Sequence, residues 1–182
     1  MKYLPIPVLL LLFSSFSSQD EKVFRVSDGN VHFLSEAPLE IIKASSTELK
    51  GALDTEKGTF AFSVSLKSFE GFNSPLQKVH FNENYIESNR FPATTFAGKL
   101  IEKYDLSQDG TYSVRAKGKF TVHGITQERI IKSQVVVKSG KINIQASFTV
   151  LLEDHDIEIP KIVFQKIAEE IKVTLEANLQ IQ

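Results

Sequence analysis

The stretch Ile142–Leu152, INIQASFTVLL, places an apolar side chain at every second position. Successive side chains of a β-strand point to opposite faces, so this alternation predicts a strand with one apolar face. Tyr112–Val122, Ile171–Ile181 and Phe60–Lys67 repeat the pattern. Strands of parallel sheets are covered on both faces and form continuous apolar runs, so alternation favours antiparallel pairing with one face in the core.

Shorter apolar patterns predict five more strands, which brings the total to about nine. They cover Val23–Val26, Val31–Leu34, Glu48–Asp54, Thr94–Ile101 and Ile130–Lys138. Three dipeptides between strands, Lys57-Gly58, Asp109-Gly110 and Ser139-Gly140, predict hairpins. Glycine supplies the positive φ that tight hairpin turns require.

Two segments lack the alternation. Phe69–Pro92 is polar and rich in Asn, which predicts a long loop with helical turns around Gln77–Glu87. Asp154–Glu169 contains a proline, and we expect one short helical stretch at Val163–Glu169.

Strands with one apolar face and little amphipathic helix to cover it leave two architectures, a sandwich and a barrel. A closed barrel buries every apolar face in one interior and removes exposed edges. We therefore favour an all-β fold, a single antiparallel barrel of about eight strands with a long polar loop and a short helix. An interior of about this size is either filled by side chains or holds one small ligand.

The N-terminus predicts a compartment. Met1–Ser18 carries one charge at Lys2, an apolar run over Leu4–Phe13, and then a tract of small residues. The run is shorter than the roughly 20 residues of a spanning helix, so we interpret residues 1–17 as a secretory signal peptide cleaved after Ser17. A permanent membrane anchor is the alternative, disfavoured by two prolines in the run. The mature domain, residues 18–182, is expected to be periplasmic or secreted, with no further segment of transmembrane length.

Composition excludes several classes of function. The chain has no cysteine, which excludes disulfide frameworks, Cys-type zinc sites and thiol nucleophiles. Lys and Arg total 21 against 22 Asp and Glu, and the four Arg are scattered, so no surface for nucleic acid is predicted. The aromatic content is 14 Phe and 4 Tyr without Trp. It is typical of a globular domain with a Phe-rich interior.

Strand alternation defines the residues expected to face the interior. They are Phe60, Phe62, Val64, Phe96, Phe120, Ala146, Phe148 and Leu175. Two interpretations stay open: the set lines a channel for a lipid tail, or it forms a packed core. Small residues on the same faces leave volume to be filled, and these are Ala116, Gly118, Ala146 and Ala177.

The four histidines do not show the short spacings of metal sites, and no nucleophile elbow or phosphate loop is present. We therefore predict no metal, no cofactor and no catalytic residue, and a structural role for His123 in its turn. His80, Asn84 and Tyr85 of the long loop are candidate contacts for a polar head group at a barrel mouth. The alternative is that these polar side chains cap the backbone of their own loop.

Four segments in register resemble one known family. They are Ala116–Glu128 (AKGKFTVHGITQE), Phe91–Gly98 (FPATTFAG), Ala146–Val150 and Asp156–Pro160. Together they resemble the YceI-like family of lipocalin-like, polyisoprenoid-binding proteins. The resemblance implies an elongated eight-stranded barrel that takes a long isoprenoid or similar lipid chain into its interior, without catalysis.

The leading hypothesis is thus a non-enzymatic extracytoplasmic binding or carrier protein for an isoprenoid-type lipid, such as a quinone or a polyprenyl phosphate. A lipid tail can gain binding free energy mainly by removing its apolar surface from water, which yields about 25 cal/mol per Å². A deep apolar interior therefore suits such a ligand. The alternatives are a lipid-modifying enzyme with His80 or His123 as base, and a structural barrel with a filled interior.

Overall fold

The computed structural model describes residues 22–181, so the predicted leader at residues 1–17 lies outside the described part. Nine strands are present in that part: β1 (Val23–Glu36), β2 (Ile41–Ser46), β3 (Leu49–Asp54), β4 (Thr59–Ser65), β5 (Ala93–Leu100), β6 (Gly110–Val122), β7 (Ile125–Lys138), β8 (Lys141–Leu151) and β9 (Glu170–Ile181). The helical elements are α1 (Pro75–His80), the π-helix η2 (Phe81–Tyr85) and the 3-10 helices η1 (Leu66–Ser68), η3 (Glu153–His155) and η4 (Lys161–Val163).

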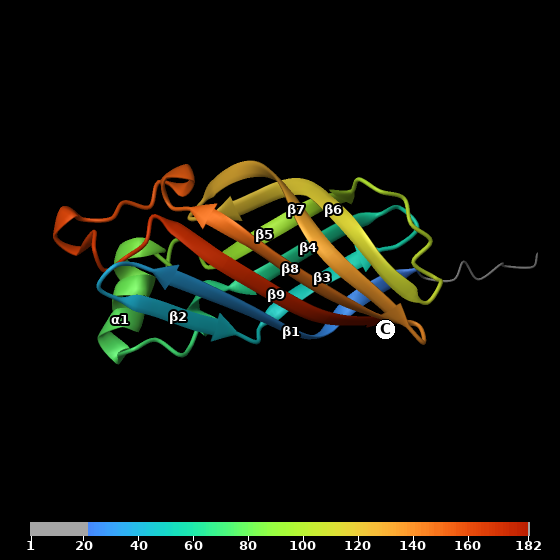
Figure 1. The fold of residues 1–182 in the computed structure, drawn as a ribbon, viewed down its shortest axis with the longest axis horizontal. Coiled ribbons are helices and arrows are strands. Elements are labelled where there is room, and N and C mark those ends of the chain that lie inside the picture. Colours follow the sequence, from blue (N-terminus) through green and yellow to red (C-terminus); the bar gives the residue numbers. More distant parts are fainter. Residues whose placement is uncertain (1–21, 182) are drawn as a thin grey trace, which may run out of the picture.

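Eight of the strands close into an antiparallel barrel, which confirms the predicted fold class (Figure 1). The sheet runs from β1 through β3 and onward to β9, and β9 pairs again with β1 from Phe24–Ile181 to Leu34–Lys172. β2 is the additional strand and pairs with the second half of β1. Closure of the barrel pairs the backbone N–H and C=O groups that would be free on edge strands, and it turns the apolar faces of the strands inward.

Strand β1 differs from the prediction. The two short strands expected at Val23–Val26 and Val31–Leu34 are one strand, with a shift of register between Val26 and Asp28. The intervening polar residues form a β-irregularity of the kind that bends a strand without ending it. β2 was not predicted, because Ile41–Ser46 begins with two adjacent apolar residues and shows no clear alternation.

Two of the three predicted hairpins are confirmed. Gly58 has φ 64° between β3 and β4, and Ser139 and Gly140 both have positive φ between β7 and β8. The third is right in its strand pairing, because β5 and β6 are antiparallel neighbours, but the tight turn expected at Asp109-Gly110 is wrong: residues 101–109 form a longer connection and Gly110 already begins β6. A further tight hairpin, not predicted, joins β6 and β7 through His123 (φ 50°) and Gly124 (φ 76°).

The helical prediction holds in one of the two irregular segments. α1 and η2 fall within the long loop, and the hydroxyl of Ser74 caps α1 by accepting a hydrogen bond from the Gln77 amide at 3.2 Å. The helical stretch predicted at Val163–Glu169 is wrong. That region contains only the single turn of η4, which follows Pro160, and then leads into β9.

One end of the barrel is packed solid. Phe24, Val137, Ile142 and Leu179 are all at most 7% exposed, and Leu106 of the β5–β6 connection is buried with them at 3%. This is the end that carries the β7–β8 hairpin and the C-terminal end of β9, opposite α1 (Figure 1).

Within residues 22–181 no helix has the length and hydrophobicity needed to cross a bilayer.

Candidate ligand-binding cavity

The rest of the barrel interior is hollow. A cavity of about 560 Å³ lies between the strands and reaches the surface beside α1 and the β8–β9 connection. Its size falls in the range of about 300–1,000 Å³ that is usual for small-molecule sites. All eight residues predicted to face the interior line it: Phe60, Phe62, Val64, Phe96, Phe120, Ala146, Phe148 and Leu175.

Strand register brings the predicted aromatic residues together. Phe62 on β4 pairs with Phe96 on β5, and Phe96 pairs with Phe120 on β6. The rings follow one another around the wall, with centroid distances of 4.9 Å for Phe60–Phe96, 6.1 Å for Phe96–Phe120 and 5.8 Å for Phe120–Phe148. Side chains at alternate positions of neighbouring strands thus form a continuous apolar wall.

The four small inward residues have different roles. Ala116 and Ala146 line the cavity, whereas Ala177 is 0% exposed and lies outside the lining. Gly118 pairs with Gly98, and a Cβ on Gly118 would lie 2.3 Å from the Ala97 carbonyl oxygen. This glycine therefore permits close approach of the β5 and β6 backbones, one of the two roles expected of a glycine within a strand.

A second aromatic cluster, which the sequence analysis missed, lies towards the open end. Phe33 of β1 stacks on Phe81 at 5.4 Å with an interplanar angle of 15°, and also contacts Phe69 and Phe72 at 5.5 and 5.9 Å. All four rings line the cavity. The available signal was the presence of Phe69, Phe72 and Phe81 in a segment that is mainly polar.

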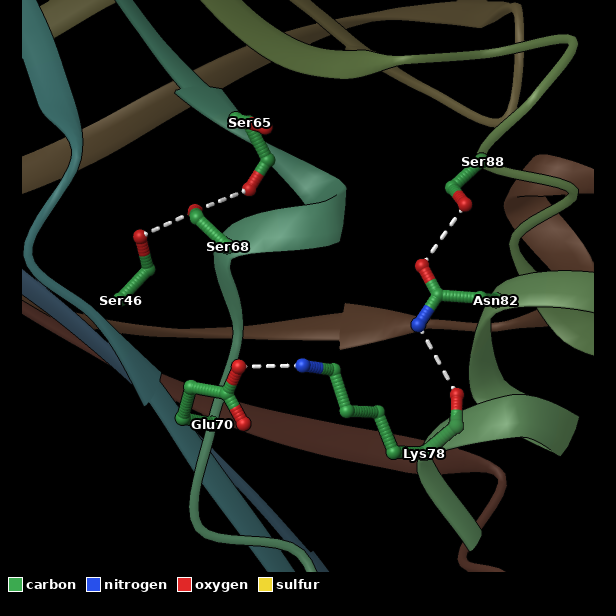
Figure 2. A network of polar contacts seen from close by, with 7 residues as sticks. All are labelled: Ser46, Ser65, Ser68, Glu70, Lys78, Asn82 and Ser88. Atoms are coloured by element: carbon green, nitrogen blue, oxygen red, sulfur yellow. Dashed lines mark hydrogen bonds and ion pairs between the residues drawn. The ribbon is translucent and has the colours of Figure 1, made fainter. Parts of the chain in front are cut away.

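Polar contacts fasten the long loop and the turn before it to the barrel (Figure 2). The Ser68 hydroxyl lies 2.6 Å from that of Ser46 on β2 and donates to the Ser65 carbonyl. Lys78 of α1 pairs with Glu70, next to the bridge that joins Glu70 to Ser45. These contacts hold the loop as a wall of the cavity.

The predicted head-group residues separate into two groups. His80 and Tyr85 line the cavity near its opening, and burial raises the pKa of the Tyr85 hydroxyl. Asn84 is exposed and is not part of the lining. The neighbouring Asn82 caps its own loop, since its amide donates to the Lys78 carbonyl at 2.9 Å and accepts from Ser88 at 2.7 Å.

Other polar residues at the opening were not predicted. Glu40 of the β1–β2 turn, Gln77 of α1 and Lys166 line the cavity there. The Gln77 amide donates to Glu40 at 2.9 Å. Lys166 makes no ion pair within the described range 22–181, so it leaves a cationic group at the mouth.

The histidines outside the cavity have structural surroundings. The His123 ring, 12% exposed, contacts the Glu87 carboxylate at 2.8 Å and the His155 carbonyl at 3.0 Å, so two polar contacts hold it in the turn. His155 is fully buried and donates from Nδ1 to the Ile125 carbonyl at 3.2 Å. Desolvation lowers the pKa of this ring. Among residues 22–181, no three His, Asp or Glu side chains gather as metal ligands would.

The family model of the YceI-like domain matches residues 23–179, almost the whole barrel. The chain belongs to the YceI-like family. Solved structures agree on the fold, although sequence identity to them is low.

A polyisoprenoid-binding domain from Saccharophagus degradans, implicated in plant cell wall breakdown, is 13% identical with a TM-score of 0.72, and the match covers 87% of this chain and 98% of that one. BcnA of Burkholderia cenocepacia is 11% identical with a TM-score of 0.68, over 82% and 95% of the two chains. The YCEI protein of Campylobacter jejuni is 12% identical with a TM-score of 0.55, over 71% and 78%. No curated protein matches this YceI-like chain.

Proposed function

We propose that this YceI-like protein binds a long isoprenoid-type lipid and carries it outside the cytoplasm, without catalysing a reaction. The single observation that carries the proposal is the apolar cavity, which is open at one end and closed at the other by packed side chains. A blind tunnel of this kind suits a ligand with one long apolar tail and one polar end, because the tail enters first and the head stays at the opening.

The composition of the walls supports an apolar tail over a polar ligand. Deep in the barrel the lining consists of aliphatic and aromatic side chains such as Phe60, Val114 and Ile131. Burial of a tail against them yields about 25 cal/mol per Å² of apolar surface. The binding of a polyisoprenoid by the domain from Saccharophagus degradans, which shares the fold, points in the same direction.

The opening supplies the groups for the head. His80, Tyr85 and Lys166 line the cavity there, and each offers a hydrogen-bond donor. Lys166 adds a positive charge that can pair with a phosphate or another anionic head, beside the Glu40 carboxylate at the same opening. Asn84 lies on the exposed side of the same loop and serves as a matched control.

Extracytoplasmic location rests on the N-terminal sequence alone. We propose that residues 1–17 are removed on export and that the mature chain begins near Ser18. Mass measurement of the exported protein is expected to show that N-terminus, and retention of the leader would contradict a freely diffusing carrier.

The test of lipid binding is mass spectrometry of an organic extract from the purified mature protein. We expect a long-chain isoprenoid lipid in stoichiometric amount, and titration of the delipidated protein with an isoprenoid quinone and a polyprenyl phosphate in detergent should show saturable binding. No lipid in the extract together with no binding of either probe would refute the proposal.

Variants at the opening test the head-group assignment separately. Combined His80→Ala and Tyr85→Phe substitutions are expected to change the ratio of the two probe affinities, while Asn84→Ala leaves it unchanged. An unchanged ratio in the double variant would assign His80 and Tyr85 to the loop alone.

A further inference from the structure

Within residues 22–181, the open end of the barrel carries the most exposed apolar side chains. Among the described residues, four large hydrophobic side chains are more than 60% exposed: Leu39 at 67%, Leu76 at 62%, Ile162 at 91% and Phe164 at 64%. They come from the β1–β2 turn, α1 and the β8–β9 connection. Three segments distant in sequence thus place their exposed apolar residues at one end of the barrel.

Hydrogen bonds hold these three segments together. The Leu39 amide donates to the Gln165 carbonyl at 2.9 Å, which ties the β1–β2 turn to the β8–β9 connection. The Gln77 amide group donates to Glu40 at 2.9 Å and ties α1 to the same turn. The four side chains therefore belong to one connected surface, which we call the apolar rim: Leu39, Leu76, Ile162 and Phe164.

The apolar rim is continuous with the cavity. Leu76 belongs to both, and Val163 and Ile167, which flank the exposed side chains in sequence, line the cavity wall. The β8–β9 connection extends beyond the strands at the end where α1 lies (Figure 1). An apolar path therefore leads from the outermost side chains to the interior of the barrel.

Two lysines lie beside the exposed side chains of the β8–β9 connection, in the stretch 159–168, which contains no acidic residue; the carboxylates of the connection lie on either side of it, at Glu153, Asp154, Asp156, Glu158 and Glu169. Lys161 precedes Ile162, and Lys166 follows Phe164 by two residues. Neither lysine forms an ion pair with another residue between 22 and 181. Apolar side chains flanked by lysines suit a bilayer surface, because the apolar groups enter the acyl boundary while the ammonium groups meet lipid phosphates.

We propose that the apolar rim docks on a lipid bilayer, with Ile162 and Phe164 inserted and the cavity opening facing the membrane. This inference rests on the proposed function, since a lipid in a bilayer reaches the tunnel without crossing water only if the opening meets the membrane. Burial of apolar surface supplies the binding, and Lys161 and Lys166 strengthen it on anionic membranes.

The test is sedimentation of the full mature protein, delipidated, with vesicles that contain no isoprenoid. We expect binding to phosphatidylcholine vesicles and tighter binding when phosphatidylglycerol is included. The I162S/F164S variant is expected to weaken binding about tenfold or more, because it removes two exposed apolar side chains. The K161Q/K166Q variant should lose the effect of phosphatidylglycerol and keep the binding to phosphatidylcholine.

A matched control uses apolar residues that are exposed elsewhere. Ile101 and Ile130 are 40% and 54% exposed, the first in the β5–β6 connection and the second on β7. The I101S/I130S variant is expected to bind vesicles like the wild type. Circular dichroism and thermal unfolding of each variant verify that the barrel is folded before its binding is scored.

Two outcomes overturn the docking proposal. One is that the wild-type protein does not bind vesicles, or that the folded I162S/F164S variant binds them with the affinity of the wild type. The other is a rim substitution that changes self-association and not vesicle binding, which would assign the surface to a second copy of the chain. Quinone delivered in detergent tests lipid binding in the cavity without any docking on a membrane. If the I162S/F164S variant still takes up quinone from detergent but no longer from vesicles, both the docking proposal and the proposed function are supported.

Discussion

Substitution of Ala146 by Trp distinguishes an open tunnel from a packed core. Ala146 lies in the middle of β8, where its Cα partners are Ser133 on β7 and Leu175 on β9, and its side chain lines the cavity. An indole at this position would project into space that we assign to the lipid tail. We expect Ala146→Trp to weaken lipid binding with little effect on the stability of the empty barrel.

The magnitude follows from the area of the ring. A large aromatic side chain buries about 150–250 Å², which at about 25 cal/mol per Å² corresponds to roughly 4–6 kcal/mol of tail contact at most. A flexible tail adjusts to the obstacle and keeps part of this contact. Loss of one third of this contact, about 1.3–2 kcal/mol, weakens binding by roughly tenfold to thirtyfold.

The matched control is the same substitution at Ala177 on β9. This alanine is 0% exposed, lies outside the cavity lining and pairs with Ile144. Overpacking at such a site costs about 1–3 kcal/mol. Each kcal/mol lowers the Tm of a domain of this size by about 2–4 °C, so Ala177→Trp is expected to melt about 2–12 °C below wild type.

The assay compares delipidated proteins by calorimetry and then titrates each with an isoprenoid quinone in detergent. Delipidation matters because a ligand at about 100 times its Kd alone stabilises the folded state by about 2.7 kcal/mol. The expected result is a Tm for Ala146→Trp close to that of wild type with a higher Kd. A Tm as low as that of Ala177→Trp, with unchanged binding, would show that Ala146 lies in a packed core and would refute the tunnel.

Three further predictions concern the scaffold. Gly98→Ala should destabilise the barrel by about 2 kcal/mol or more in urea unfolding, because the new Cβ would lie 2.1 Å from the Lys117 carbonyl oxygen. His123→Ala should cost about 1–3 kcal/mol, and His123→Asn less, since Asn tolerates the positive φ of this turn. Burial lowers the pKa of the His155 ring below 6.5. As the pH decreases below 6.5, the unfolded chain therefore takes up a proton at this residue before the folded protein does, and the free energy of unfolding falls. His155→Phe should flatten this dependence of the free energy of unfolding on pH, measured by urea titrations.

The sequence alone predicted the strands and their inward faces because alternation records which side of a strand is buried. The inward set from Phe60 to Leu175 lines the cavity as a group, since closure turns all these faces to one interior. The same pattern could not tell a hollow barrel from a filled one. Phe148 and Leu179 look alike in sequence, yet one borders the cavity and the other packs the closed end.

The wall formed by the long loop escaped prediction for a different reason. Phe69, Phe72 and Phe81 follow neither a period of 2 nor one of 3.6, and their contact with Phe33 depends on tertiary structure. Polar residues dominate the segment and suggested a solvated loop. The overlooked signal was that exposure of Phe69, Phe72 and Phe81 to water is unfavourable. A loop that carries three such side chains is expected to cover an apolar surface.

The polar network around this loop adds to the apolar burial of the loop itself. Phe69 and Ile86 are 4% and 7% exposed in the empty barrel, whereas Phe72 and Phe81 border the cavity and gain further apolar contact when a ligand is bound. The Ser46–Ser68 contact at the start of the loop and the Lys78–Glu70 pair are polar anchors that help to keep the wall in place in the empty barrel (Figure 2). Tail binding then adds apolar contact to Phe69 and Phe81 from within. The loop is accordingly the part of the barrel whose protection from amide hydrogen exchange should increase most when a lipid enters.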